Sequence, residues 1–390
     1  MNEKKKVTVA CVNTALHEVG GETRRLRNLY LKINGPGHRF LIAYCSRQKE
    51  AVEKFFLDGG VNPQDLFWFP TSKRTFFIPL VMNLRKLYIT EKVDIMHSFF
   101  LHSDILGFIS ALLAGVKIRI SNVEGTFLLD ERYGVNKAKQ CCYSFINRMI
   151  RPFFFRTVAV SAGLKEELVQ DFGLRRDKIE VINIGIEIPS KDMIHREING
   201  KAAKVIANAA RFSKDKGLEY LLRAAPGVIR EIPEARFVLA GTGDEEASLK
   251  KMVKDLGIES KVFFPGWVKD MVQFMRDMDV FVMTSIREGC PMTLMEALSF
   301  AKPAVAFNVP GPQEMIVNGE NGFLVEPFDV QQLSAVIVQA CKDPERARQF
   351  GENGRRRAEE RFSVEIEAKK MKSLYSRALS EGFDDSKTKE

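Results

Sequence analysis

The stretch that decides the fold runs from Asp279 to Leu298 and reads DVFVMTSIREGCPMTLMEAL. Its first part, Asp279–Met283, is apolar and rich in valine, as a strand covered on both faces must be. A short loop with Gly289 and Pro291 follows, and a helical period then begins at Met292. A buried strand joined by a short loop to a helix is the unit of parallel α/β sheets. The stretch therefore predicts an α/β fold.

The same alternation of short apolar runs and helix-period segments continues along the chain. The predicted strands are Val7–Val12, Arg39–Cys45, Asp94–Phe99, Val116–Ser121, Thr157–Val160, Lys204–Asn208, Arg236–Ala240, Lys261–Phe264, Asp279–Met283 and Ala304–Phe307. The predicted helices include Thr23–Ile33, Asp104–Ala114, Ala162–Asp171, Leu218–Glu231, Asp244–Leu256, Met292–Phe300, Val330–Cys341 and Val364–Ser380. Between Ile184 and Gly200 no period is visible, which indicates a domain boundary.

These elements predict two doubly wound, Rossmann-like domains in tandem, over residues 1–188 and 189–363. A helix over 364–382 and a disordered tail over 383–390 follow. Ligands of such sheets bind at the carboxyl ends of the strands, so two domains that face each other would form a site in the cleft between them.

Composition excludes several classes of protein. The chain has 390 residues, 45% of them hydrophobic and 28% charged, which rules out wholesale disorder, a coiled coil and a collagen-like fibre. Its longest uncharged apolar run, Ile105–Val116, is too short to span a membrane, and the N-terminus lacks a signal-peptide pattern. The six cysteines form no C-x-x-C pair, which favours a reducing cytosol and argues against structural zinc.

The positive charge is concentrated in the first half. Residues 1–180 contain 28 Lys and Arg against 18 Asp and Glu, a net of +10, whereas the remainder has a net of −1. Such a distribution favours an anionic partner: nucleic acid, a phosphorylated substrate or an anionic membrane surface.

Two glutamates frame the predicted turn into the helix at Met292. Glu288 lies in the loop after the strand, and Glu296 lies one to two turns into the helix. The first backbone N–H groups of that helix, at Met292, Thr293 and Leu294, attract phosphate. The pattern predicts a sugar–nucleotide site, in which Glu288 binds sugar hydroxyls and Glu296 binds ribose.

Other loops after predicted strands add to this site. Arg211 and Lys216 place two cations after the strand Lys204–Asn208, which suits a diphosphate leaving group. Glycine-rich turns follow further strands and let backbone amides approach a phosphate or sugar: Gly20 and Gly21, and Gly241. The loop Pro265–Val268 is predicted to line a nucleobase pocket. No G-x-G-x-x-G fingerprint occurs at the first turn, which counts against an NAD enzyme.

Taken in order, these segments resemble the retaining GT-B glycosyltransferases of family 4. The resemblance covers nearly the whole chain and rests on ARFSKDKG, LAGTGDE, FFPGW, DVFVMTSIREGCPMTLMEAL, KPAVAFNVPGPQEMI and NGFLVEP. It implies two domains that face a cleft, with the last helix crossing back onto the N-terminal domain. It also implies an acceptor-side first domain, a donor-binding second domain, and an enzyme that needs neither a divalent metal nor a bound cofactor.

The resemblance assigns roles to individual residues. Arg211, Lys216 and Glu288 are the implied catalytic residues. Donor contacts are implied for Gly20, Gly21, Gly241, Val268, Gly289, Cys290, Pro291, Met292, Thr293, Leu294 and Glu296. The donor is expected to be a UDP-sugar or GDP-sugar, and the acceptor a glycan or a lipid-linked glycan. One departure is that no histidine follows the strand Val116–Ser121, so Glu124, His97 and His102 are the acceptor-side candidates.

Two segments mix basic and large apolar residues, Lys73–Lys86 and Arg148–Arg156. They are either core residues with a basic rim or a surface for an anionic membrane, and both interpretations stay open. The expected location is the cytoplasm, with peripheral binding to the inner face of the membrane as a hypothesis. The alternatives to a glycosyltransferase are an epimerase or phosphorylase of the same fold, an inactive sugar–nucleotide sensor and a nucleic-acid-binding protein. The last lacks support, because no zinc knuckle, RNP-like strand or basic helix occurs.

Overall fold

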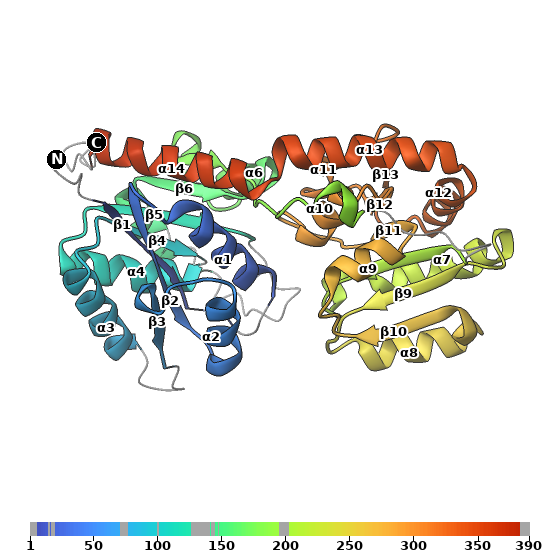
Figure 1. Ribbon diagram of the computed structural model, residues 1–390, viewed down its shortest axis with the longest axis horizontal. Helices are drawn as coiled ribbons and strands as arrows, with labels where there is room; N and C mark the ends of the chain where they lie inside the picture. The colour runs from blue at the N-terminus through green and yellow to red at the C-terminus, as the bar shows by residue number, and fades with distance from the viewer. Residues whose placement is uncertain are drawn as a thin grey trace. The chain divides into compact units, whose positions relative to one another are not determined.

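The computed structural model describes residues 6–14, 16, 20–70, 77–99, 101–125, 141, 145, 146, 148–194 and 203–382 (Figure 1). The chain forms two compact units. The first unit contains the residues up to Gly185 and those from Val364 onward, and the second unit contains Ile186–Ser363. The chain therefore passes from one unit to the other twice. Within the described ranges, no helix has the length and apolar character needed to cross a membrane.

The first unit is built on a seven-stranded sheet in which every pair of neighbouring strands is parallel. Its strands, in spatial order, are β3 (Leu66–Phe69), β2 (His38–Cys45), β1 (Val7–Asn13), β4 (Ile95–Phe99), β5 (Ile118–Val123), β6 (Arg156–Ala159) and β7 (Ile179–Val181). The central strands β1 and β4 are apolar and almost fully buried, because helices cover both faces of the sheet.

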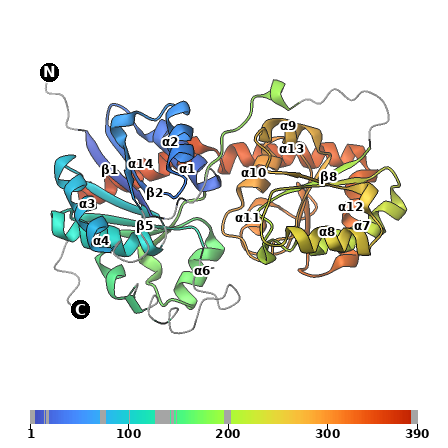
Figure 2. The same cartoon turned by 90° about the horizontal axis from the view of Figure 1, so that it is seen from below.

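Helices lie on both faces of this sheet (Figure 2). One face is covered by α1 (Gly21–Ile33), α2 (Lys49–Asp58) and α14 (Val364–Glu381), whose apolar residues share one core with the strands. The other face is covered by α3 (Phe77–Thr90) and α4 (Leu101–Ala114). A further helix, α6 (Ala162–Gln170), follows β6 and is capped by the Ser161 hydroxyl, which accepts from the backbone N–H of Leu164 at 3.2 Å.

The second unit has a six-stranded sheet, also parallel throughout. Its strands, in spatial order, are β10 (Val262–Gly266), β9 (Arg236–Ala240), β8 (Val205–Ala209), β11 (Val280–Met283), β12 (Ala304–Phe307) and β13 (Gly322–Val325). Its helices are α7 (Leu218–Glu231), α8 (Glu246–Asp255), α9 (Met271–Asp277), α10 (Met292–Ser299), α11 (Pro312–Met315), α12 (Val330–Lys342) and α13 (Pro344–Arg361). In both sheets the strand order reverses beside the first strand, as in doubly wound folds.

The predicted fold class, two Rossmann-like α/β domains, is confirmed. The last helix, α14, belongs to the first unit, where Ala368, Met371, Leu374 and Tyr375 are buried in the core. The predicted boundary at residue 188 lies three residues after Gly185, the last residue of this part of the first unit. The predicted disordered tail, 383–390, lies outside the described residues. How the two units face each other, and hence the predicted cleft, stays a prediction.

Candidate active site

The strongest candidate site lies where β8 and β11 run side by side in the second unit. The two strands are parallel and adjacent, and β8 continues through α7 to β9 on its other side. The strand order therefore reverses here, and ligands of doubly wound sheets bind at such a point, beyond the carboxyl ends of the strands. The loop after β8 carries Arg211 and Lys216, and the loop after β11 carries Glu288.

The side chains of Lys216 and Glu288 meet across these two loops. Lys216 Nζ donates to Glu288 Oε1 at 2.8 Å and lies 3.5 Å from Asp215 Oδ2. Ser213 Oγ in turn donates to Asp215 Oδ1 at 2.6 Å, which fixes that carboxylate. Burial alone would lower the pKa of Lys216, but Glu288 and Asp215 raise it above its ordinary value. Lys216 is therefore a fixed cation, with 21% of its side chain exposed.

Backbone contacts hold the two loops in this register. The backbone N–H of Ile286 donates to the carbonyl of Asp215 at 2.9 Å, and Thr284 Oγ1 donates to the carbonyl of Lys216 at 3.3 Å. Gly217 adopts a left-handed conformation with φ of 57° as the chain turns into α7. A Cβ atom at this position would overlap the carbonyl oxygen of Thr284. Glycine is therefore required here twice, for its conformation and for the close approach of the two loops.

Gly241 has a packing role that sequence reasoning missed. Its φ is 136°, and a Cβ atom would overlap the carbonyl oxygen of Ala210 in the loop after β8. Gly243 approaches the carbonyl of Phe212 in the same way, and the backbone N–H of Phe212 donates to Thr242 O at 2.8 Å. This glycine-rich turn therefore supports the loop that carries Arg211 and Lys216. Its predicted approach to the donor stays a prediction.

The helix α10 begins directly after the Glu288 loop. Pro291 is its N-cap residue and no side chain caps it, so its first-turn amides point outward from an uncapped end. Gly311, with φ of 91°, packs against this loop; a Cβ atom there would lie 3.0 Å from the carbonyl oxygen of Glu288. Because an uncapped N-terminus with a partial positive charge lies after the Glu288 loop, the arrangement suits a phosphate.

The remaining donor-side candidates differ in exposure. Arg211 is exposed, whereas Glu296 is half-buried in the second turn of α10. Cys290 and Leu294 are buried, and Gly289, Met292 and Thr293 are half-buried. Val268 follows β10, the edge strand, which β9 separates from β8. The structure thus brings Lys216 and Glu288 into contact and places Val268 at the edge of the sheet, away from the reversal point.

In the first unit, Gly20 and Gly21 form the turn after β1 as predicted for a first βα turn. Gly20 is the N-cap of α1, and its carbonyl accepts from the backbone N–H of Arg24 at 3.0 Å. A Cβ atom at Gly20 would meet no described atom within 4 Å, so the backbone is approachable there. Residues 17–19, which precede it, lie outside the described ranges.

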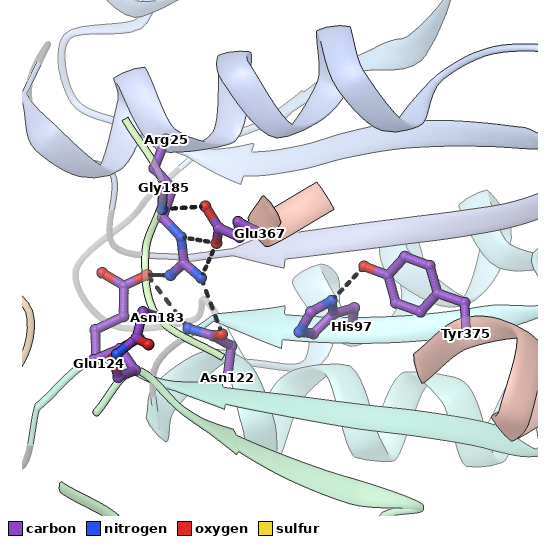
Figure 3. Close-up of polar contacts among 9 residues, drawn as sticks. Arg25, His97, Asn122, Glu124, Asn183, Gly185, Glu367 and Tyr375 are labelled. Atoms are coloured by element: carbon purple, nitrogen blue, oxygen red, sulfur yellow. Dashed lines mark hydrogen bonds and ion pairs between the residues drawn. The ribbon is translucent and has the colours of Figure 1, made fainter. Parts of the chain in front are cut away.

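A buried ion cluster lies beside this turn, and sequence reasoning missed it (Figure 3). Arg25 of α1 donates through Nε to Glu367 Oε1 of α14 at 2.7 Å and through Nη1 to Glu124 Oε1. The second carboxylate oxygen of Glu367 accepts from the backbone N–H of Gly185 at 2.7 Å. Burial would lower the pKa of Arg25, but Glu367 and Glu124 raise it, so the guanidinium stays charged. One signal could have indicated Arg25: it lies four residues before Leu29, on the core-facing side of α1.

The three acceptor-side candidates occupy different surroundings. Glu124 follows β5 and has 12% of its side chain exposed, with one carboxylate oxygen bound by Arg25. His97 is fully buried in β4, and its Nδ1 forms a hydrogen bond of 2.8 Å with the hydroxyl of Tyr375 (Figure 3). Burial, followed by the charge of Arg25, lowers the pKa of His97 to about 3, so the ring is neutral. His102 is exposed in the first turn of α4. These surroundings favour a structural role for His97.

Among the described side chains, no three His, Cys, Asp or Glu residues gather as a metal site would require. Cys11, Cys45, Cys290 and Cys341 are buried, as expected of small apolar residues, but Cys141 is exposed. The cysteine at 142 lies outside the described ranges.

Two family models match the chain, one on each unit. The model described as Glycosyltransferase Family 4 matches residues 19–188, and the model described as Glycosyl transferases group 1 matches residues 191–357. The chain belongs to the group 1 glycosyltransferases. The second match contains Lys216, Glu288 and α10, so the group 1 glycosyltransferase segment includes the site described above.

Curated relatives of this group 1 glycosyltransferase cover most of its length. It is 26% identical over 328 residues to UDP-Gal:alpha-D-GlcNAc-diphosphoundecaprenol alpha-1,3-galactosyltransferase of Escherichia coli, which covers 78% of this chain and 84% of that protein. It is also 26% identical over 319 residues to the capsular polysaccharide biosynthesis glycosyltransferase CapM of Staphylococcus aureus, which covers 77% and 81%.

Solved structures show the same fold. Anabaena HepE, solved in complex with UDP-glucose, superposes with a TM-score of 0.79 at 19% identity and covers 95% of this chain and 99% of that one. Staphylococcus aureus TarM, solved with UDP and acceptor-like glycans, gives a TM-score of 0.76 at 15% identity over 95% and 99% of the two chains. The group 1 glycosyltransferase thus has the GT-B fold.

Proposed function

We propose that this glycosyltransferase transfers a sugar from a nucleoside-diphosphate sugar to a lipid-linked or polysaccharide glycan, with retention of the anomeric configuration. The observation that carries the proposal is the contact of Lys216 with Glu288. Their loops are 72 residues apart in sequence, and they meet at the reversal point of the second sheet, at 2.8 Å. A cation for a diphosphate and a carboxylate for sugar hydroxyls thus lie side by side.

The proposed mechanism is one of positioning and electrostatics. The bond between the anomeric carbon and the diphosphate oxygen breaks, and negative charge grows on the diphosphate. Lys216, Arg211 and the N-terminus of α10 stabilise that charge, while Glu288 orients the sugar and Glu296 binds the ribose. These fixed cations fit a reaction that needs no divalent metal at the diphosphate. In the absence of donor, Glu288 holds Lys216 in place.

Similarity to other proteins supports the choice of donor and acceptor. HepE was solved with UDP-glucose, and the Escherichia coli relative uses a UDP-sugar and a diphosphoundecaprenol-linked acceptor. The Staphylococcus aureus relative acts in capsular polysaccharide biosynthesis. A UDP-sugar is therefore the proposed donor and GDP-sugar the alternative. We place the reaction in the cytoplasm, with the enzyme at the inner face of the membrane. Glu124 and His102 are the proposed acceptor-side residues.

The test is a transfer assay with a panel of UDP- and GDP-sugars and a lipid-diphosphate-linked sugar as the acceptor, in the presence of EDTA. The expected result is release of one nucleoside diphosphate together with a new glycoside, whose anomeric proton coupling matches that of the donor. An inverted anomer would refute retention, and activity that returns only on adding Mg²⁺ or Mn²⁺ would refute metal independence. Donor binding without any product would favour the sensor, and an isomerised donor would favour the epimerase.

A further inference from the structure

Large apolar side chains are exposed on one side of the first unit. Ile78, Met82 and Ile89 of α3 are 73%, 47% and 50% exposed, and Leu112 and Leu113 of α4 are 58% and 51% exposed. More than half of the large apolar side chains that are exposed in the described residues lie between Phe77 and Phe153. A gathering of this kind marks an interaction surface, whereas single exposed residues would not.

These residues form one continuous surface. The helices α3 and α4 pack side by side on the same face of the sheet (Figures 1 and 2). Arg85 Nε of α3 donates to the carbonyl of Leu113 in α4 at 3.1 Å. On the other side of α4, the ring of Phe108 lies 5.7 Å from that of Phe153, which is 41% exposed. The α3–α4 face is defined here as Ile78, Met82, Ile89, Leu112, Leu113 and Phe153.

The core does not account for the apolar residues of this face. On α3 the buried side is formed by Leu80, Val81, Leu84, Leu87 and Tyr88. Ile78, Met82 and Ile89 follow the helical spacing of four and seven residues on the opposite side. A helix that covers a sheet normally presents polar residues to solvent, so a helix that is apolar on both sides requires a second apolar environment.

The charges around this face are positive. Lys86 of α3, Lys117 after α4 and Arg148 are all exposed. The helix α3 contains no acidic residue, and the one acidic residue of α4, Asp104, is fully buried and pairs with Arg151 at 2.6 Å. Glu91, directly after α3, pairs with Arg39 at 2.7 Å. The occupant of the face must therefore be apolar at its centre and anionic around it.

We propose that the α3–α4 face docks on an anionic lipid bilayer. Its apolar side chains enter the boundary between headgroups and acyl chains, while Lys86, Lys117 and Arg148 contact lipid phosphates. A bilayer supplies both an apolar interior and an anionic surface, which matches the two properties of the face. The proposal extends the proposed function, since a lipid-linked acceptor lies in such a bilayer, but it does not depend on the identity of the donor.

The test is co-sedimentation of the full chain with vesicles of phosphatidylcholine, with or without phosphatidylglycerol. The wild type should sediment with the anionic vesicles, and less so at high salt. The variant Ile78→Ser/Met82→Ser/Leu113→Ser should bind more than tenfold more weakly, and Lys86→Gln/Lys117→Gln should weaken binding by about fivefold per charge. The control Leu31→Ser/Leu57→Ser changes exposed leucines of α1 and α2, on the other face of the sheet, and should bind as the wild type does.

Each variant is first checked for its melting temperature and for the thermal shift that UDP causes in the second unit. A folded, UDP-responsive variant that no longer sediments supports the proposal. Equal sedimentation of the α3–α4 variant and the wild type overturns it, as does a wild type that ignores anionic vesicles. If the wild type ignores vesicles but self-associates through this face in analytical ultracentrifugation, the occupant is a second copy, and the proposal is wrong. Loss of the UDP response in the wild type contradicts the proposed donor and leaves membrane docking unaffected.

Discussion

Lys216 lies between two carboxylates, Glu288 at 2.8 Å and Asp215 at 3.5 Å. Both keep it charged despite partial burial. The adjacent Lys214 carries the same charge but is exposed. The pair Lys214 and Lys216 therefore separates a positioned cation from a cation that is merely nearby.

We predict that Lys216→Ala lowers kcat about 10² to 10³-fold, or roughly 2.7–4 kcal/mol of lost transition-state stabilisation. The reason is that a fixed positive charge no longer faces the departing diphosphate. Lys214→Ala, the matched control, should stay within about twofold of the wild type. The measurement is steady-state release of the nucleoside diphosphate at saturating donor. Equal activity of Lys216→Ala and the wild type would remove Lys216 from the proposed mechanism.

His97 provides a prediction about pH. Burial, and then the charge of Arg25, lower its pKa from 6.5 to about 3, so the unfolded chain binds a proton before the folded chain does. The contribution of His97 to stability is therefore complete above pH 6.5 and falls as the pH drops toward 3, by about 1.4 kcal/mol per pH unit. His97→Gln should remove this part of the pH dependence in urea unfolding between pH 6.5 and pH 4.

Tyr375→Phe is the matched variant, because it removes the hydrogen bond to His97 but leaves the ring buried. It should keep the pH dependence of the wild type while lowering stability at every pH. If His97→Gln and the wild type lose stability in parallel on acidification, His97 is not a buried neutral histidine.

At the scale of residues, the sequence indicated the donor-side residues because they lie in short loops after apolar strands. The contact of Lys216 with Glu288 needed only that β8 and β11 be neighbours, which the doubly wound pattern implies. The cluster of Arg25, Glu124 and Glu367 could not be predicted in this way. Arg25 and Glu367 are 342 residues apart, and nothing local marks them as partners.

At the scale of elements, the turn into α7 shows how one glycine sets the register of two loops. Gly217 has a left-handed backbone and lies against the carbonyl of Thr284, at the end of β11. Gly257 has a similar φ of 67°, but a Cβ atom there would meet open space.

We predict that Gly217→Ala destabilises the protein clearly more than Gly257→Ala does. Both substitutions pay the left-handed strain of about 1–2 kcal/mol, but only the first also forces the loops after β8 and β11 apart. Gly217→Ala should therefore also weaken UDP binding, whereas Gly257→Ala should not. Urea unfolding and a UDP titration measure the two effects. Similar losses in both variants would show that the close approach to Thr284 is unimportant.

Elements that the sequence analysis missed have a common cause. The helix α13 buries Phe350, Gly351, Gly354 and Ala358, so its core-facing side is mostly small residues and gives no apolar period. A Cβ atom at Gly354 would lie 2.8 Å from Leu298 of α10, which explains why the residue is small. The strand β3 has four half-buried residues at the edge of its sheet and lacks the fully apolar pattern of a central strand.

At the scale of the whole molecule, the chain leaves the first unit at Gly185 and returns to it at Val364. Glu367, close to the second crossing, binds the backbone N–H of Gly185 at the first crossing and the guanidinium of Arg25. One carboxylate thus joins the start of α14 to the last residue of the first unit's main segment. Burial raises the pKa of Glu367, while Arg25 opposes that rise.

We predict that Glu367→Ala destabilises the first unit by about 3–5 kcal/mol, because Arg25 would keep its buried charge and lose a partner. Glu365→Ala is the matched control on the same helix. Glu365 pairs with Lys32 at 2.7 Å, but the pair is exposed, so the substitution should cost under about 1 kcal/mol. Denaturant unfolding measures both variants, and equal stabilities would contradict the account of α14.

The central claim is that a nucleoside diphosphate binds at the carboxyl ends of β8 and β11. The most direct measurement is a thermal-shift panel of UDP, GDP and ADP on the wild type, Glu296→Ala and the exposed control Glu320→Ala, all in EDTA. One diphosphate, expected to be UDP, should stabilise the wild type and the control by about 2.7 kcal/mol at a hundredfold excess over Kd, and Glu296→Ala should lose that response. If no diphosphate shifts the wild type, or if Glu296→Ala responds as fully as the control, the proposed donor site is wrong.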